Sequence, residues 1–171
     1  MLEIKVLALV EIESIDVLGI FVDVLTLFAL VFPINGRKAL WDGSNPDEKR
    51  QSIAKTLERS VAQTVKAQKA NRWGGWRYSP TSTEADTSVT GSVLMGLLAS
   101  RNAGIAVPDE AIENALVYMQ RNTASSGFVA YSGGIGGGGQ SMARSAVASL
   151  VYAVGHKREW EEYEAALSHI S

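Results

Sequence analysis

Very few side chains in this sequence of 171 residues can take part in acid–base or metal chemistry. There is no cysteine, which excludes disulfides, thiolate nucleophiles, cysteine-ligated zinc and iron–sulfur clusters. Two histidines occur: His156 lies in a charged stretch after Gly155, and His169 lies two residues before the last one. We therefore predict no catalytic residue, no metal site and no cofactor.

An oligoglycine segment, GIGGGG over 134–139, matches the G-x-G-x-x-G pattern of dinucleotide-binding loops. Glu159 lies twenty residues beyond its last glycine, as that pattern requires. The pattern binds phosphate only within a strand–helix–strand unit, whereas residues 158–170 have a helical composition with no second strand. We interpret the glycines as a turn between helices.

Asp86 is the acidic residue whose position is most informative, since the segment 89–100 that follows it contains no charge. A carboxylate at the start of a helix accepts hydrogen bonds from backbone amides that lack a partner within the helix. We interpret Asp86 as such a cap, with a ligand-binding role as the alternative.

Aromatic residues follow two glycine-containing turns of the sequence. Together with Asp86 they are the candidate ligand-binding residues of an apolar cavity. These residues are Trp76, Tyr78, Phe128 and Tyr131. The alternative is that they pack in the core, where aromatic side chains bury a large apolar area.

The segments that position these residues read as helices of two alternating kinds. Amphipathic helices are predicted over 46–70, from 108 onward and over 159–170, because their apolar residues recur every three or four positions. Nearly uncharged helices are predicted over 87–101 and 141–154, the second ending at a glycine cap, Gly155. A helix without a charged face must be covered nearly all round. The sequence therefore predicts an all-α fold.

The alternation has a period. Gln68 precedes Trp76 by eight residues, and Gln120 precedes Phe128 by eight, so both pairs repeat at a spacing of 52. Repeated units that cannot bury their own apolar faces are stabilised by stacking on their neighbours. We predict tandem helical hairpins, about two and a half of them, with open edges at the ends of the stack.

Four segments carry a resemblance to the prenyltransferase and squalene-cyclase repeat superfamily, which covers residues 46–171. They are GGWRYSP (74–80), ADTSVTGSVLMGLLA (85–99), VPDEAIENALVYM (107–119) and SGFVAYSGG (126–134). The resemblance implies an α/α toroid, in which apolar inner helices are ringed by amphipathic outer ones. With fewer helices than a closed ring needs, this chain is expected to form an arc of the toroid.

The catalytic groups of that superfamily have no counterpart here. Ser88, in Asp86-Thr87-Ser88, stands where the resemblance to prenyltransferases would place a zinc-binding cysteine. Ala85 stands where the resemblance to terpene cyclases would place the proton-donating acid, with Glu84 as the neighbour that could replace it. The resemblance therefore implies a module of this fold without its chemistry.

Residues 1–40 form a separate, apolar N-terminal region that precedes the helical region 44–171. The run 17–34 would span about 27 Å as a helix, close to the hydrocarbon core of about 30 Å. It is either a membrane anchor, which would leave the rest of the chain on the cytoplasmic side, or a buried helix, a strand pair or an unrelated extension of a cytoplasmic protein.

Residues 49–77 contain eight basic residues and one acid, although the whole chain has a net charge of -2. Such a stretch suits an anionic membrane surface or a solvated helix face. Nucleic-acid binding is not expected, because no known nucleic-acid-binding motif accompanies the charge.

Three functions fit the sequence. The first is a non-catalytic repeat module that associates with itself, with a partner protein or with a lipid surface through its open repeat edges. The second is an enzyme that acts on an isoprenoid chain, in a cavity lined by Trp76, Tyr78 and Phe128. In the third, the chain is a fragment of a larger ring.

Overall fold

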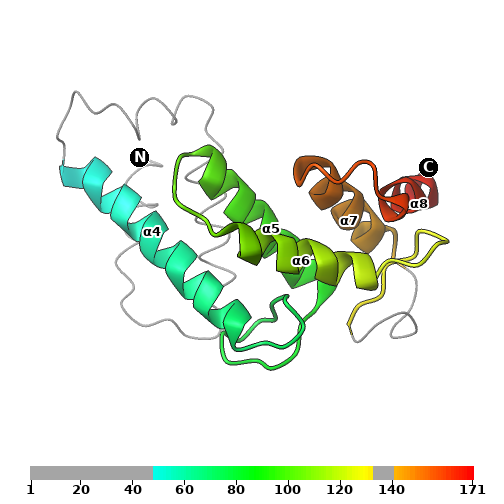
Figure 1. The fold of residues 1–171 in the computed structure, drawn as a ribbon, viewed down its shortest axis with the longest axis horizontal. Coiled ribbons are helices and arrows are strands. Elements are labelled where there is room, and N and C mark those ends of the chain that lie inside the picture. Colours follow the sequence, from blue (N-terminus) through cyan, green and yellow to red (C-terminus); the bar gives the residue numbers. More distant parts are fainter. Residues whose placement is uncertain (1–47, 133–140) are drawn as a thin grey trace, which may run out of the picture.

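The computed structural model describes residues 48–132 and 141–171, which form five α-helices (Figure 1). They are α4 (Glu48–Lys69), α5 (Thr87–Asn102), α6 (Asp109–Arg121), α7 (Met142–Val154) and α8 (Glu161–Ile170). These residues contain no strand, only an isolated antiparallel bridge between Thr123 and Val129. The all-α prediction is confirmed, and each helix begins within two residues of its predicted start; the four helices with a predicted end finish within one residue of it.

Two predicted features lie outside the described residues: the apolar region 1–40 with its run 17–34, and the oligoglycine segment 134–139. Among the helices that are described, none combines the length and the apolar character needed to cross a membrane.

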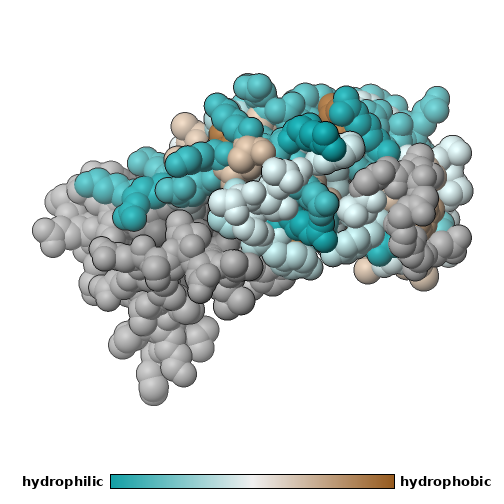
Figure 2. Space-filling view, turned by 90° about the horizontal axis from the view of Figure 1, so that it is seen from below, coloured by the Kyte–Doolittle hydropathy of each residue, from teal (hydrophilic) through white to brown (hydrophobic). Residues whose placement is uncertain are grey.

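The helices pack side by side, with α5 and α7 making most of the contacts between helices (Figure 1). α5 contacts α4, α6 and α7, while α8 packs against α7. The surface on one side of this assembly is mostly hydrophilic or neutral, with scattered apolar residues (Figure 2). The core is continuous across the helices, and its largest fully buried side chains include Trp76, Leu94, Leu97, Leu116, Met119 and Tyr152.

α5 is covered nearly all round, as its lack of charge predicted. Ten of its sixteen residues are buried, and the half-buried ones include Ser88, Ser92 and Met95, which follow one stripe. α7 packs directly against Gly91, where a Cβ atom would lie 2.2 Å from Cγ1 of Val147. The absent side chain therefore allows α5 and α7 to approach each other closely.

α7 is not covered all round, so the corresponding prediction for residues 141–154 is wrong. Met142 and Leu150 are 61% and 50% exposed, and Ala143 and Ala146 are exposed as well. Nearly half of α7 is alanine and serine, whose small side chains fit either a covered or an exposed helix face, so its composition did not show which face would be uncovered.

Two glycines in left-handed conformation shape the turns that precede α5 and α7. Gly74 has φ of 80° and Gly127 has φ of 79°. A Cβ atom on Gly127 would lie 2.0 Å from the carbonyl oxygen of Ala165 in α8. Gly155 is the C-cap of α7, as predicted, but its φ is −77°, and the left-handed residue is the next one, His156.

Candidate functional site

Asp86 is fully buried at the head of α5 and is the N-cap of that helix. Its Oδ1 accepts a hydrogen bond of 2.9 Å from the backbone amide of Val89, and its own amide donates to the carbonyl oxygen of Trp76 over 2.9 Å. This geometry confirms the interpretation of Asp86 as a helix cap, since the carboxylate satisfies an amide of the first turn.

The second oxygen of Asp86, Oδ2, has no hydrogen-bond partner among the described residues, and neither does the buried hydroxyl of Tyr118. Burial raises the pKa of Tyr118, and the charge of Asp86 adds to this effect, while Arg77 opposes it. Two unpartnered polar atoms inside a protein are unusual, because each loses its hydrogen bonds to water on folding.

Tyr131 belongs to the same electrostatic neighbourhood. A hydrogen-bonding interaction with the Asp86 carboxylate is the main cause that raises the pKa of Tyr131 to about 12, and burial and the charge of Asp86 add to it. Tyr78 contributes to the same shift. The structure thus brings together three of the five candidate residues, Tyr78, Asp86 and Tyr131, with Tyr118 as a fourth member that the sequence analysis missed.

The other two candidate residues have structural contacts of their own. The indole of Trp76 is buried and donates a hydrogen bond of 2.8 Å to the carbonyl oxygen of Thr64 in α4. Phe128 is half-buried, and the guanidinium of Arg144 lies 5.9 Å from the ring centroids of both Phe128 and Tyr131. Trp76 therefore packs in the core, which the sequence analysis gave as the alternative to lining a ligand-binding cavity.

The two residues that the sequence analysis compared with the catalytic acid of terpene cyclases, Ala85 and Glu84, have different surroundings. Ala85, which the resemblance to terpene cyclases singled out, is buried in the core. Glu84 lies on the surface and forms an ion pair with Arg77. Among the described residues, no three histidine or acidic side chains lie together in a way that could hold a metal ion.

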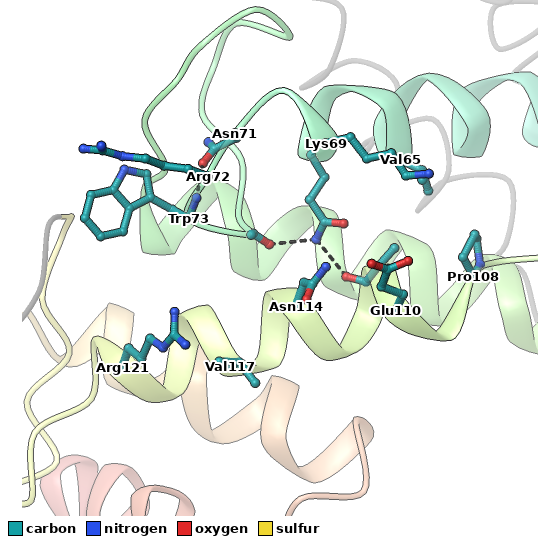
Figure 3. Close-up of a pocket in the computed structure, with 13 residues that line it drawn as sticks. Val65, Lys69, Asn71, Arg72, Trp73, Pro108, Glu110, Asn114, Val117 and Arg121 are labelled. Carbon is teal, nitrogen blue, oxygen red and sulfur yellow. Dashed lines mark hydrogen bonds between the residues drawn. The ribbon is translucent and has the colours of Figure 1, made fainter.

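A groove of about 330 Å³ lies between the C-terminal end of α4 and α6, and none of the five candidate residues lines it (Figure 3). Its lining includes three basic residues, Lys69, Arg72 and Arg121, together with Trp73 and one acid, Glu110. The sequence analysis missed this groove, although two of these basic residues lie in the positively charged stretch 49–77. The third comes from α6, and no local pattern could have joined it to them.

No family model, curated protein or solved structure matches this chain. The resemblance to the toroid superfamily therefore rests on the sequence motifs alone.

Proposed function

We propose that this chain is a non-catalytic helical-hairpin module of the squalene-cyclase-like toroid type, and that it associates with a second copy of itself through α7. The observation that carries the proposal is the uncovered apolar face of α7, formed by Met142, Ala143, Ala146 and Leu150. We call it the α7 face.

The turns before α5 and α7 support the repeat. Gly74 and Gly127 share the left-handed conformation and each lies against the next outer helix, at Asn114 of α6 and at Ala165 of α8. Trp76 and Val129, each two residues after its glycine, are both buried. This correspondence pairs Trp76 with Val129, whereas the spacing of 52 in the sequence paired it with Phe128.

The starts of the two inner helices correspond as well. Thr90 is the fourth residue of α5, and its hydroxyl accepts a hydrogen bond of 3.0 Å from the amide of Trp76. Ser145 is the fourth residue of α7, and its hydroxyl donates over 2.8 Å to the carbonyl oxygen of Gly127. In each unit a buried hydroxyl therefore ties the inner helix to the preceding glycine turn.

The same correspondence shows which residue of the α7 face is equivalent to the contact point on α5. Gly91, the residue after Thr90, is where α7 packs on α5. Its counterpart after Ser145 is Ala146, which is small and exposed. The α7 face thus continues the contact that α5 makes with α7, and none of the five described helices covers it.

The chemistry of the α7 face favours a second copy as its occupant. A twofold-symmetric contact brings the same residues of each copy together, so any charge would face its like. The four residues of the face carry no charge, and Ala146 at their centre permits close helix approach. Two copies can therefore bury the exposed Met142 and Leu150 side chains against each other.

The test is the concentration dependence of the molar mass, measured by light scattering and sedimentation equilibrium. We expect a dimer in the wild type and a monomer in Leu150→Glu, while Leu167→Glu, which alters an exposed leucine of α8, stays dimeric. A wild type that is monomeric at all concentrations, or a Leu167→Glu variant that dissociates equally, overturns the proposal.

The absence of native cysteine permits a second, geometric test. Ala146→Cys should form an intermolecular disulfide under mild oxidation, whereas Ser168→Cys, exposed on α8, should not. A dimer that forms no disulfide through residue 146 would place the contact elsewhere. If the protein floats with lipid vesicles and Leu150→Glu abolishes this flotation, the α7 face binds a lipid surface and not a second copy.

One observation favours the second candidate function, an isoprenoid cyclase or prenyltransferase-type enzyme: Oδ2 of the buried Asp86 has no hydrogen bond of normal geometry among the described residues, and the buried hydroxyl of Tyr118 has none either. Incubation with squalene and with prenyl diphosphates, followed by product analysis, addresses it. Turnover that is lost in Asp86→Asn would support the enzyme, and absence of turnover would leave the association module as the function.

A further inference from the structure

We propose that the groove between α4 and α6 is a second binding site, which takes an acidic segment of a partner protein. The carboxylates of this acidic segment would bind Lys69, Arg72 and Arg121, and an apolar side chain of the segment would lie against Trp73. This site is separate from the α7 face and does not depend on it.

The floor of the groove is held in place by hydrogen bonds inside the protein. The buried side-chain amide of Gln68 donates to the carbonyl oxygen of Gly74 over 2.7 Å and to that of Ala111 over 2.8 Å (Figure 3). These bonds join α4, the glycine turn and the first turn of α6. A partner would therefore meet a largely preformed surface, which reduces the ordering cost of binding.

The basic residues of the groove have no acidic partner among the described residues. Elsewhere in the described chain Arg77, Arg101 and Lys157 form ion pairs with Glu84, Asp109 and Glu113. By contrast, no ion pair joins Lys69, Arg72 or Arg121 to a described acid. Figure 3 shows Arg72, Trp73 and Arg121 at one end of the groove, with Glu110 toward the other end beside Pro108.

Trp73 supplies an exposed aromatic surface at the basic end. Its side chain is 39% exposed, and the guanidinium of Arg72 lies 5.0 Å from the centroid of its ring. The turn that carries it is anchored by Asn71, whose side-chain oxygen accepts from the backbone amide of Trp73 over 2.8 Å and whose side-chain amide donates to the carbonyl oxygen of Glu84 over 2.6 Å. Tryptophan and arginine side by side are typical of the residues that dominate protein interfaces.

The chemistry of the groove selects among anionic partners. Glu110 lines one end, where it would repel a continuous polyphosphate backbone, and the whole chain has a net charge of -2. An acidic peptide can place its carboxylates at the basic end and neutral residues near Glu110. The side-chain amide of Asn114, also in the lining, can bind a peptide group of such a segment.

The test uses the full chain and a short fluorescein-labelled peptide of aspartate and glutamate with a single leucine, followed by fluorescence anisotropy. We expect saturable binding that weakens with salt and is lost when asparagine and glutamine replace the acidic residues. Arg72→Glu and Arg121→Glu should each weaken binding by about tenfold or more, the usual effect of losing a direct charged contact.

Lys66→Glu is the matched control, because Lys66 is exposed in the last turn of α4 but does not line the groove. It should change the affinity by less than about threefold, while Trp73→Ala should weaken binding without changing its salt dependence. Equal effects of Lys66→Glu and Arg121→Glu would show binding by net charge alone and overturn the proposal. Failure to bind the peptide, or binding only to phosphatidylserine vesicles, would overturn it as well.

Discussion

At the scale of single residues, the two carboxylate oxygens of Asp86 have different surroundings. Oδ1 caps α5 by accepting from the amide of Val89, whereas Oδ2 is buried without a partner among the described residues. The same carboxylate acts on Tyr118 and Tyr131. Asp86 thus combines a local role in starting a helix with an electrostatic role that extends to α6 and to the turn before α7.

The cap and the charge of Asp86 can be separated by substitution. Asp86→Ala removes the acceptor for Val89 and should lower the free energy of unfolding by about 1–2 kcal/mol, measured by urea denaturation. Asp86→Asn keeps an acceptor oxygen and removes the buried charge, so its loss should be smaller. In that variant the phenol pKa of Tyr131 should fall from about 12, since the carboxylate that raises it is gone. Equal losses for both variants would contradict the cap as the main stabilising role.

At the scale of helices, α5 and α7 are both nearly uncharged but lie in different environments. α5 is enclosed by α4, α6 and α7, whereas α7 is covered on one side by α5 and α8 and open at the α7 face. The close contact at Gly91 is the point where the two helices depend on each other. Because Gly91 has no side chain, α7 can lie close to α5 at this point.

Gly91→Ala tests this contact. In a helix, alanine is more favourable than glycine by about 1 kcal/mol. Its Cβ atom, however, would lie 2.2 Å from Cγ1 of Val147. The valine cannot easily turn away, because its rotamer is restricted in a helix. We expect a net destabilisation of about 1–3 kcal/mol in urea unfolding. Adding Val147→Ala should recover part of this loss, giving a favourable coupling in the double-mutant cycle. Purely additive effects would mean that the helices separate without strain.

At the scale of the whole molecule, the tyrosines link stability to pH. Tyr118 and Tyr152 are buried, and burial is the main cause that raises the pKa of each. Tyr131 is raised to about 12. In the unfolded chain all three phenols lose their protons near pH 10. The folded state therefore holds protons that the unfolded state releases.

The sign of the pH effect follows from linkage. Because the unfolded state binds fewer protons above about pH 10, the tyrosine contribution to the free energy of unfolding should be constant below that pH and fall as the pH rises toward about 12. Urea unfolding at a series of alkaline pH values measures the slope. Tyr118→Phe should reduce the slope and leave stability at neutral pH unchanged or higher, since its hydroxyl has no partner among the described residues.

Tyr152→Phe provides the control for this prediction. The Tyr152 hydroxyl is hydrogen-bonded to Thr123 over 2.7 Å, so its removal should cost about 1 kcal/mol at neutral pH while reducing the alkaline slope in the same way. A Tyr118→Phe variant that loses as much stability as Tyr152→Phe would show that the Tyr118 hydroxyl has a partner, such as a buried water shared with Asp86.

The sequence by itself determined the helices, the cap at Asp86 and the enclosure of α5. These features depend on interactions within a few residues: apolar spacing, backbone amides at a helix start and the absence of charge. Only the tertiary structure decided that the α7 face is exposed, that the charge of Asp86 acts on Tyr118, and that Arg121 lines the same groove as Lys69 and Arg72. Each of these depends on how separate helices are placed against one another, and side chains such as alanine and serine in α7 are compatible with either a covered or an exposed face.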